Sequence, residues 1–517
     1  MGNYFCHLVY IEDKAMNKKN YRITNTEKSS FIFFLTSFIL IVSLTAEDVN
    51  ENLKKASQLI LDGEKIFKTK KDANKSYEKF QEAVKLAPED GKVLSDAGWW
   101  IYNPLGKPKE ALPILQSAVK ATNVQPLALS SIIDVYTMLG DFESAFEACE
   151  KAIEFWEGEI KKFPNDNREY RENELVEVFG KKANVLISQA KFDSALELTE
   201  EVFAKFPTTK NQTLIYAKCE VLHIRAGYKL EKNNFNDSEE LIKQCVSLYK
   251  RNPNLSNKEN SKYKDLQLAL SLLSKRKAMG KISPATTQKI LSFIVEGIDI
   301  DQEIKGKRVK ANDKMKEDMI YRLKAGQFWY KLYLEVMTNG QLSLEFKNVE
   351  AGTAKKLLVV PLKEPDYILE IDPDSITPSI SSVLSEHQNY DHFLFYWNGK
   401  TSGLNLGTGV AYQYSPLTLA GFSFGQPRGY SIMATNPEMY GLFDGLLHHE
   451  YGHLLEALSQ ISFVHCTDLT VKDKVKPVYS TWNKSCDTIY DWFLNTALKG
   501  KYSDMNWQKR YPANVSK

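Results

Sequence analysis

The sequence has little net charge and few cysteines, and each shortage excludes a class of protein. Its 517 residues carry 67 Lys and Arg against 65 Asp and Glu, a formal net charge of +2. Such a balance gives no chain-wide positive potential, so we do not expect nucleic acid as a partner. Six cysteines are too few for disulfide bonds to hold together a chain of this length, which excludes a disulfide scaffold. The 43% of hydrophobic residues suffices for large cores, and the length predicts several domains.

Long apolar runs are also scarce, and the one that occurs spans residues 31–46. Basic residues precede it and Glu47-Asp48 follows at once, which is typical of a signal peptide cleaved after Ala46. The run is close to the shortest length that crosses a bilayer, so an uncleaved anchor remains the alternative. We therefore expect residues 1–46 to be a leader, and the protein to be exported (secreted or periplasmic) or anchored to a membrane by this run.

Residues 47–255 have a helical pattern with an internal repeat. The segments that begin at Ala83, Ala118 and Ala152 resemble one another and lie 35 and 34 residues apart. This period, with small residues where paired helices would cross, resembles the tetratricopeptide repeat (TPR). The resemblance implies an all-α array of helical hairpins. Such arrays commonly bind peptides or proteins, and a rigid spacer without a ligand is the alternative.

The repeat continues beyond an insertion at Gly158–Glu172. A further match at Ala190–Leu196 follows 50 residues after the preceding unit, and a degenerate unit begins at Asn234. Residues 256–316 carry two apolar runs, Leu266–Leu273 and Thr287–Val295, ahead of a charged segment. We interpret residues 256–316 as a helical connector.

The strongest chemical signal is His449-Glu450-Tyr451-Gly452-His453. Apolar residues on either side recur with a helical period, which places the motif on an amphipathic helix. His449 and His453 then lie one turn apart on one face, where both imidazoles can bind a single Zn²⁺. Glu450 is placed to deprotonate a metal-bound water. The motif resembles the HExxH helix of zincin metallopeptidases.

The elements before this motif fit that resemblance. Residues 317–517 would form an α+β zincin-like domain, because helix, strand, helix and strand precede the motif in the order found in zincins. The expected elements are a helix at Met319–Val336, strands at Leu342–Phe346 and Leu357–Pro361, a helix at Ile376–Leu384 and a strand at His392–Trp397.

A third zinc ligand must come from elsewhere in the chain. No glutamate follows Glu456, which argues against the gluzincin pattern, and Ser459 stands where metzincins have a third histidine. Residues 484–491 resemble the aspzincin signature Gly-Thr-x-Asp-x-x-Tyr-Gly, with Ser485 for the threonine and with Lys484 and Asp491 in place of the two glycines.

The aspzincin resemblance assigns roles to two residues. It implies that Asp487 ligates zinc and that Tyr490 donates a hydrogen bond to the oxyanion of the tetrahedral intermediate. Asp491 and His465 are the alternative third ligands, followed by Asp468 and Glu456.

Two cysteines near this region form a candidate disulfide. Cys466 and Cys486 belong to the same C-terminal region of a chain expected to be exported. Cys149, Cys219 and Cys245 fall on helical apolar stripes, where a reduced core cysteine is the simpler interpretation.

A competing motif, Gly421-Phe-Ser423-Phe-Gly425, satisfies the Gly-x-Ser-x-Gly pattern of serine hydrolases. A nucleophile elbow needs a helix directly after its serine, and the glycine and proline that follow argue against one. The sequence therefore predicts a zinc-dependent endopeptidase that hydrolyses peptide bonds. The alternative is a TPR-type interaction scaffold with a catalytically silent zincin domain, and a combination in which the repeats deliver a substrate is also open.

Overall fold

The computed structural model describes residues 50–257, 260–284, 286–361, 367–399, 404, 409–414, 417–419, 422–424, 428–434 and 447. The chain divides into two compact units, Met1–Ala148 and Cys149–Lys517, and each is considered by itself. The expected leader at 1–46 lies outside the described residues. None of the described helices is both long enough and apolar enough to cross a membrane.

The first unit is a stack of helices with well-defined ends. It comprises the helix at 50–70, α3 (Ala73–Leu86), α4 (Gly91–Tyr102), α5 (Pro108–Ala118), α6 (Pro126–Leu139) and the start of α7 (Phe142–Lys162). Asp72 and Asp90 cap α3 and α4 through their carboxylates. Gly140, with φ +76°, supplies the left-handed residue that ends α6.

The repeat alanines lie in the interior of these helix pairs. Ala83 and Ala111 are fully buried in one core with Phe80 and Leu115, and Ala118 and Ala145 are also fully buried. A Cβ at Gly98 would stand 2.5 Å from the Leu115 side chain, so α4 and α5 cross closely. The N-terminal region is thus a TPR-like array of helical hairpins, as its repeat pattern predicts.

The array continues in the second unit, in five helices that we call the second repeat block. Its helices are α8 (Arg168–Ser188), α9 (Phe192–Lys205), α10 (Gln212–Glu231), α11 (Phe235–Arg251) and α12 (Ser261–Ala278). Ala195 and Ser238, the small residues of α9 and α11, are fully buried. The insertion at Gly158–Glu172 lengthens α7 and α8 on either side of a short turn.

The prediction of a helical connector is wrong for residues 286–314. Among the described residues of the expected connector at 256–316, α12 is the helix, and the chain then forms β1 (Thr286–Ile304) and β2 (Lys307–Lys314), joined by a turn at Lys305-Gly306 with φ of +47° and +75°. β1 lies between two parallel strands and is covered on both faces, so Ile290, Leu291, Phe293 and Ile294 are all fully buried. A strand buried on both faces loses the alternation that would separate it from a helix in sequence.

The remaining elements build the α/β region. They are α13 (Glu317–Met337), β3 (Leu342–Ala354), β4 (Leu357–Pro361), β5 (Tyr367–Ile371), the 3₁₀ turn η1 (Pro373–Ser375), β6 (Ile376–Thr377), α14 (Ser381–Glu386), β7 (His392–Trp397), β8 (Gly409–Tyr414), β9 (Leu417–Leu419), β10 (Phe422–Phe424) and β11 (Arg428–Ala434). The strands expected at 342–346, 357–361 and 392–397 are confirmed, as is the helix at 319–336. The helix expected at 376–384 is wrong for its first half, because residues 376–377 form β6 and α14 begins only at Ser381.

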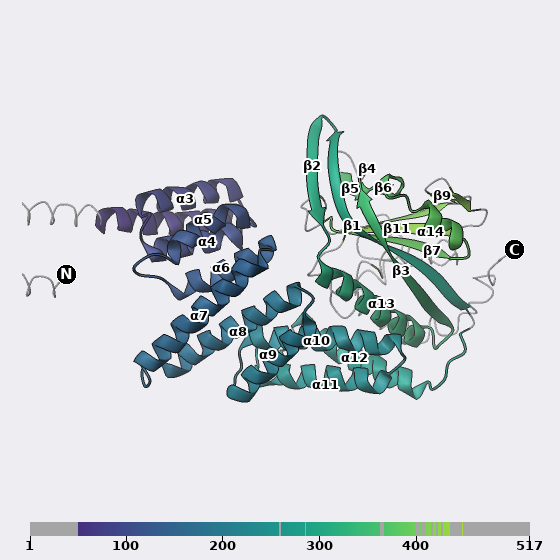
Figure 1. Cartoon of the computed structure of the whole chain (residues 1–517), viewed down its shortest axis with the longest axis horizontal. Coiled ribbons are helices and arrows are strands. Elements are labelled where there is room, and N and C mark those ends of the chain that lie inside the picture. The colour runs from purple at the N-terminus through teal and green to yellow at the C-terminus, as the bar shows by residue number, and fades with distance from the viewer. Residues whose placement is uncertain are drawn as a thin grey trace, which may run out of the picture. The chain divides into compact units, whose positions relative to one another are not determined.

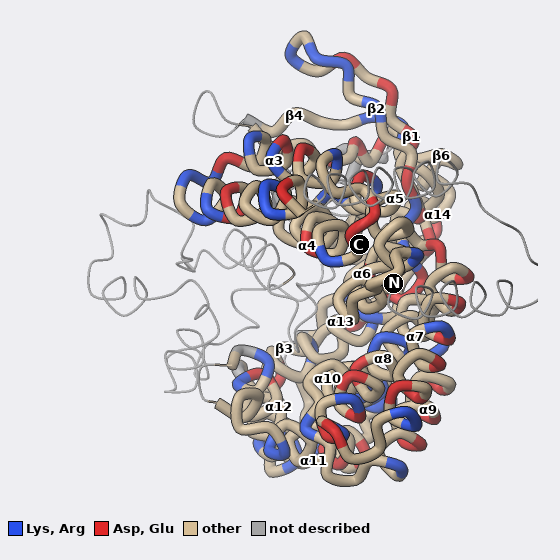
Figure 2. The backbone as a smooth tube through the Cα atoms, turned by 90° about the vertical axis from the view of Figure 1, so that its left-hand side faces the viewer, with Lys and Arg blue, Asp and Glu red and all other residues tan. Residues whose placement is uncertain are grey.

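The main sheet is mixed, with the order β6-β3-β1-β7-β11-β8 and with β2 paired to β1. Strands β3, β1, β7 and β11 are parallel neighbours, whereas β6, β2 and β8 pair antiparallel at the margins. Figure 2 shows that β1 and β2 extend from the sheet as an arm on which basic and acidic residues are interspersed, and Arg308 pairs there with Asp301.

Helix α13 is the central element of the second unit. In Figure 1 it lies between the repeat helices α10 and α12 on one side and strands β1 and β3 on the other. One core joins all three layers, with Leu222 from α10, Trp329 and Tyr333 from α13, and Leu342 and Leu394 from the sheet. The opposite face of the sheet packs a separate core that includes Leu384 of α14 and Leu357 of β4.

Candidate functional sites

The proposed metal site lies outside the described residues. This holds for His449, Glu450 and His453, for Asp487 and Tyr490, for the alternative ligands Asp491 and His465, and for Cys466 and Cys486. Among the residues that the structure does describe, no group of three His, Cys, Asp or Glu side chains could hold a metal ion. The zinc assignment therefore stays a prediction.

Leu447 is the described residue nearest to the motif. It is helical, fully buried, and stands two positions before His449. It belongs to the core that contains Met433 of β11 and Trp329 and Tyr333 of α13. Leu447 therefore lies on the face of the sheet that α13 covers.

Ser423 of the competing hydrolase motif lies in the middle of β10. This strand pairs antiparallel with β9, with Ser423 opposite Thr418. A nucleophile elbow places its serine between a strand and a helix, and a serine inside a hairpin strand lacks that geometry. The structure agrees with the sequence argument against a serine hydrolase.

In the second repeat block, one face of α10 is covered by α13. Glu220, His223 and Gly227 occupy this face at helical spacing. Glu220 forms an ion pair with Arg322, and the ring of His223 lies 5.6 Å from that of Trp329. A Cβ at Gly227 would lie 2.9 Å from the Cβ of Ala325, so glycine permits the close approach of the two helices.

Burial determines the protonation state of the His223 ring between α10 and α13. Burial lowers the pKa of His223 to about 4, so the imidazole is neutral at physiological pH and packs as an uncharged ring. At the edge of the same contact, Tyr228 meets the rings of Tyr321 and Phe328 at 6.1 and 5.8 Å. Burial raises the pKa of Tyr228, which keeps its hydroxyl protonated. The interface between α10 and α13 is thus largely apolar, with an ion pair at Glu220 and a hydrogen bond from the Tyr228 hydroxyl to the Tyr321 carbonyl.

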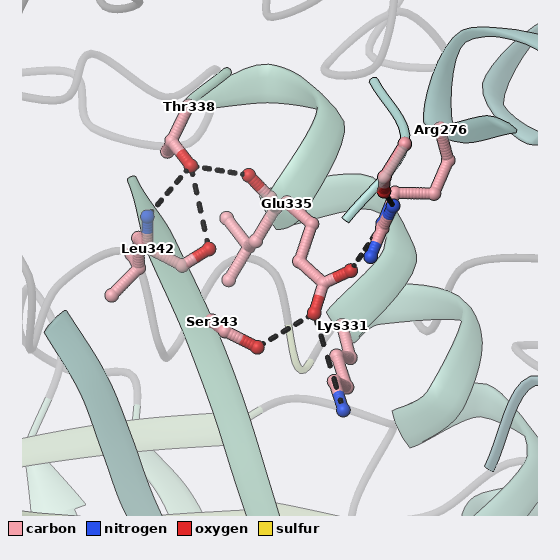
Figure 3. A network of polar contacts seen from close by, with 8 residues as sticks. Arg276, Lys331, Glu335, Thr338, Leu342 and Ser343 are labelled. Carbon is pink, nitrogen blue, oxygen red and sulfur yellow. Dashed lines mark hydrogen bonds and ion pairs between the residues drawn. The ribbon is translucent and has the colours of Figure 1, made fainter. Parts of the chain in front are cut away.

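A buried polar network ties α13 to both neighbouring layers, as Figure 3 shows. The Nε of Arg276 on α12 donates to the Oε2 of Glu335 on α13 at 2.8 Å, and the side chains are only 7% and 5% exposed. The Oγ of Ser343 on β3 donates to the other carboxylate oxygen at 2.6 Å. The hydroxyl of Thr338 accepts from the backbone N–H of Leu342 at 3.0 Å. Glu335 therefore connects the repeats, α13 and the sheet.

The first unit carries a comparable face on α4 and α6, which we call the open face. On α6 it comprises Leu127, Asp134 and Met138, where Leu127 is 37% and Met138 50% exposed. On α4 it comprises the partly buried Asp96, which precedes Ala111 of α5 by 15 positions, as His223 of α10 precedes Ser238 of α11. The hydroxyl of Tyr102 on α4 donates to Asp134 at 3.0 Å, which sets these two helices side by side.

Asp96 has the most perturbed carboxyl of this face. Burial raises the pKa of Asp96, the negative charges of Asp90 and Glu64 add to the effect, and Lys92 opposes it. The carboxyl thus lies in a partly desolvated and locally acidic position. A cation supplied by a binding partner would be attracted to it.

Two of the cavities formed by described residues lie on the helices of the second unit. The larger, of about 1150 Å³, lies between α7, the start of α8 and the loop after α9, and is lined by Ile160, Tyr170 and Phe206 among mixed charges. It is walled by the insertion at Gly158–Glu172. The smaller, of about 710 Å³, lies where Phe192, Tyr228 and Tyr321 meet.

The expectation of buried thiols is confirmed, since Cys149, Cys219 and Cys245 are buried and reduced.

Comparisons with known proteins give low similarity. No family model matches the chain, and no curated protein matches it. Solved structures match part of it. MamA protein is 14% identical, and the match covers 40% of this chain and 94% of that one with a TM-score of 0.27. YrrB, a TPR protein with an unusual peptide-binding site, is 15% identical over 41% of this chain and 94% of that one, with a TM-score of 0.25.

A tetratricopeptide repeat protein from Parabacteroides merdae is 13% identical, and the match covers 54% of this chain and 93% of that one with a TM-score of 0.27. Because these scores are low, the TPR-like assignment rests on the helix pairs and buried small residues of this chain.

The sequence pattern predicts the helix α13 but not its role as the central helix of the second unit. The signal was present, because α13 has apolar residues on every side, and such a helix is expected to be covered all round. Two polar residues in its middle and second half, Gln327 and Glu335, are buried and hydrogen-bonded. The pattern indicates a central helix rather than the surface helix of a separate domain.

Proposed function

We propose that the chain is a protein-interaction scaffold in which the first unit binds a protein partner through its open face. The observation that carries this proposal is the partial exposure of Leu127 and Met138 on a repeat face whose counterpart in the second block is covered by a helix. Exposed apolar side chains that line one face of a repeat array are typical of binding surfaces.

A matched pair of substitutions tests this function. Leu127→Glu places a charge on the open face, whereas Lys109→Glu places the same side chain on an exposed position of α5. Proteins captured from the host by residues 47–517 should be lost with Leu127→Glu and kept with Lys109→Glu, and binding should then be reproduced with the purified partner. Identical capture by both variants would contradict the proposal.

A zinc peptidase is the second candidate, and the His449–His453 motif favours it. Support also comes from Leu447, which is helical and buried against the α13 core directly before the motif. His449, His453 and Asp487 would hold the ion, with Asp491 or His465 as alternatives to Asp487. Bound zinc would supply Lewis acidity and a polarised water.

The remaining roles in that reaction fall to residues of the chain. Glu450 would accept the proton of the attacking water and pass it to the leaving amine. Tyr490 would donate a hydrogen bond to the developing oxyanion. The substrate would be a peptide or protein, which the repeats could recruit.

Metal content and one variant separate this candidate from a silent domain. Residues 47–517 should contain one zinc per chain, and Glu450→Gln should retain the zinc while losing peptide hydrolysis. Unchanged cleavage by Glu450→Gln would end the catalytic assignment. A protein without zinc, and without thermal stabilisation on adding zinc, would favour the scaffold alone.

A further inference from the structure

The contact between α10 and α13 points to the kind of partner that the first unit takes. We propose that the open face binds an α-helix that presents apolar side chains to this face and directs a basic residue at Asp96. This inference rests on the proposed scaffold function and names the partner class. Helix α13 is the template for this partner, because the chain packs it on the corresponding face of its own second repeat block.

The register of the repeats relates the two faces. Glu220 and Gly227 precede Ser238, the small residue of α11, by 18 and 11 positions. Leu127 and Asp134 precede Ala145, the small residue of α7, by the same 18 and 11 positions. Both small residues are fully buried, so they hold equivalent places in their helix pairs. The face of α6 is therefore the counterpart of the face of α10 that holds a helix.

The chemistry of the occupied face indicates what the open face would select. On α10, the carboxylate of Glu220 pairs with Arg322 of the bound helix, while the rings of His223 and Trp329 pack beside it. The open face offers the same two elements. Asp96 provides a partly desolvated carboxylate, and it precedes Ala111 by the same 15 positions that separate His223 from Ser238. Leu127 and Met138 provide apolar contacts.

A helix suits such a face better than an extended strand. A helix presents residues three and four positions apart on one stripe, so apolar and basic side chains can meet Leu127, Met138 and Asp96 together. Peptides that bind helical grooves carry apolar anchors at this spacing. The second repeat block cannot serve the same partner, because α13 already covers the corresponding face of α10.

The test uses residues 47–517 and a fluorescent synthetic peptide with the 21-residue sequence of α13, Glu317–Met337. Fluorescence anisotropy should show saturable binding that Asp96→Lys weakens by about tenfold or more. Glu82→Lys, the same charge reversal at an exposed position of α3, should leave the affinity within about twofold. The peptide carrying Arg322→Glu should bind poorly to the natural chain and regain affinity for the Asp96→Lys chain.

A peptide carrying Gly326→Pro separates helix recognition from peptide binding in general, because proline breaks the helix at its centre. Loss of binding by this peptide supports the inference. Equal binding of the proline peptide, still weakened by Leu127→Glu, would overturn the helix inference and leave the scaffold function standing. Binding that ignores Asp96→Lys and Leu127→Glu, or no binding at all, would overturn the inference.

Discussion

Replacing Glu335 by Gln should destabilise the second unit strongly, because it leaves a buried cation without its carboxylate. The side chains of Arg276 and Glu335 are 7% and 5% exposed, and removing one partner of such a pair costs about 3–5 kcal/mol. Arg276 keeps a hydrogen bond to the carbonyl of Gly280 at 2.8 Å and its contact with the ring of Phe235. We therefore expect the lower end of the range, about 3 kcal/mol.

Urea denaturation of residues 47–517, followed by far-UV circular dichroism, measures the change. Arg276→Met combined with Glu335→Leu should recover most of the loss, since a well-packed apolar pair can replace a buried ion pair at little cost. Asp301→Asn, which breaks the exposed pair with Arg308 on the β1–β2 arm, is the control and should leave the midpoint unchanged. Equal midpoints for Glu335→Gln and Asp301→Asn would refute the reasoning.

Three further predictions concern packing, pH and domain limits. Gly227→Ala should lower the free energy of unfolding by about 1–3 kcal/mol, because its Cβ would meet α13. Gly158→Ala, in open space on α7, should raise it by about 1 kcal/mol. Thermal melts compare the two variants. Burial raises the pKa of Asp265 to about 6, so the folded chain holds this proton more tightly and stability should fall as pH rises from about 4 to about 6. Asp265→Asn should remove that fall in melts run across this pH range, and an unchanged pH profile would contradict it. A fragment of residues 149–517 should unfold cooperatively, whereas 256–517 should aggregate because it lacks α10; a soluble, cooperative 256–517 fragment would disprove the dependence.

The helices of the repeat array could be predicted from the sequence because local signals agree with their packing. Ala83, Ala118 and Ala152 recur at a near-constant spacing, and each is fully buried in its helix pair. The long strand β1 could not be separated from a helix in the same way. Its first half pairs along both edges with β3 and β7 and is buried on both faces, and no local pattern encodes those distant neighbours.

The two candidate sites also differ in how far the sequence alone predicts them. The His449–His453 motif is readable because its chemistry requires a fixed spacing along one helix. The binding role of α10 was not readable, because it depends on a helix about a hundred residues later in the chain, as the pairing of Glu220 with Arg322 illustrates. Contacts between distant segments leave no periodic trace in a single sequence.

Helix α13 joins the second repeat block physically to the α/β region. One core runs from Leu222 of α10 through Trp329 and Tyr333 of α13 to Leu447, two residues before His449. A close-packed core resists small displacements, so a change at α10 that moves α13 must also be accommodated at Leu447. The second repeat block is for this reason part of the framework of the α/β region rather than a detachable adaptor. Binding at the open face would need no such rearrangement, because that face belongs to a unit with its own core.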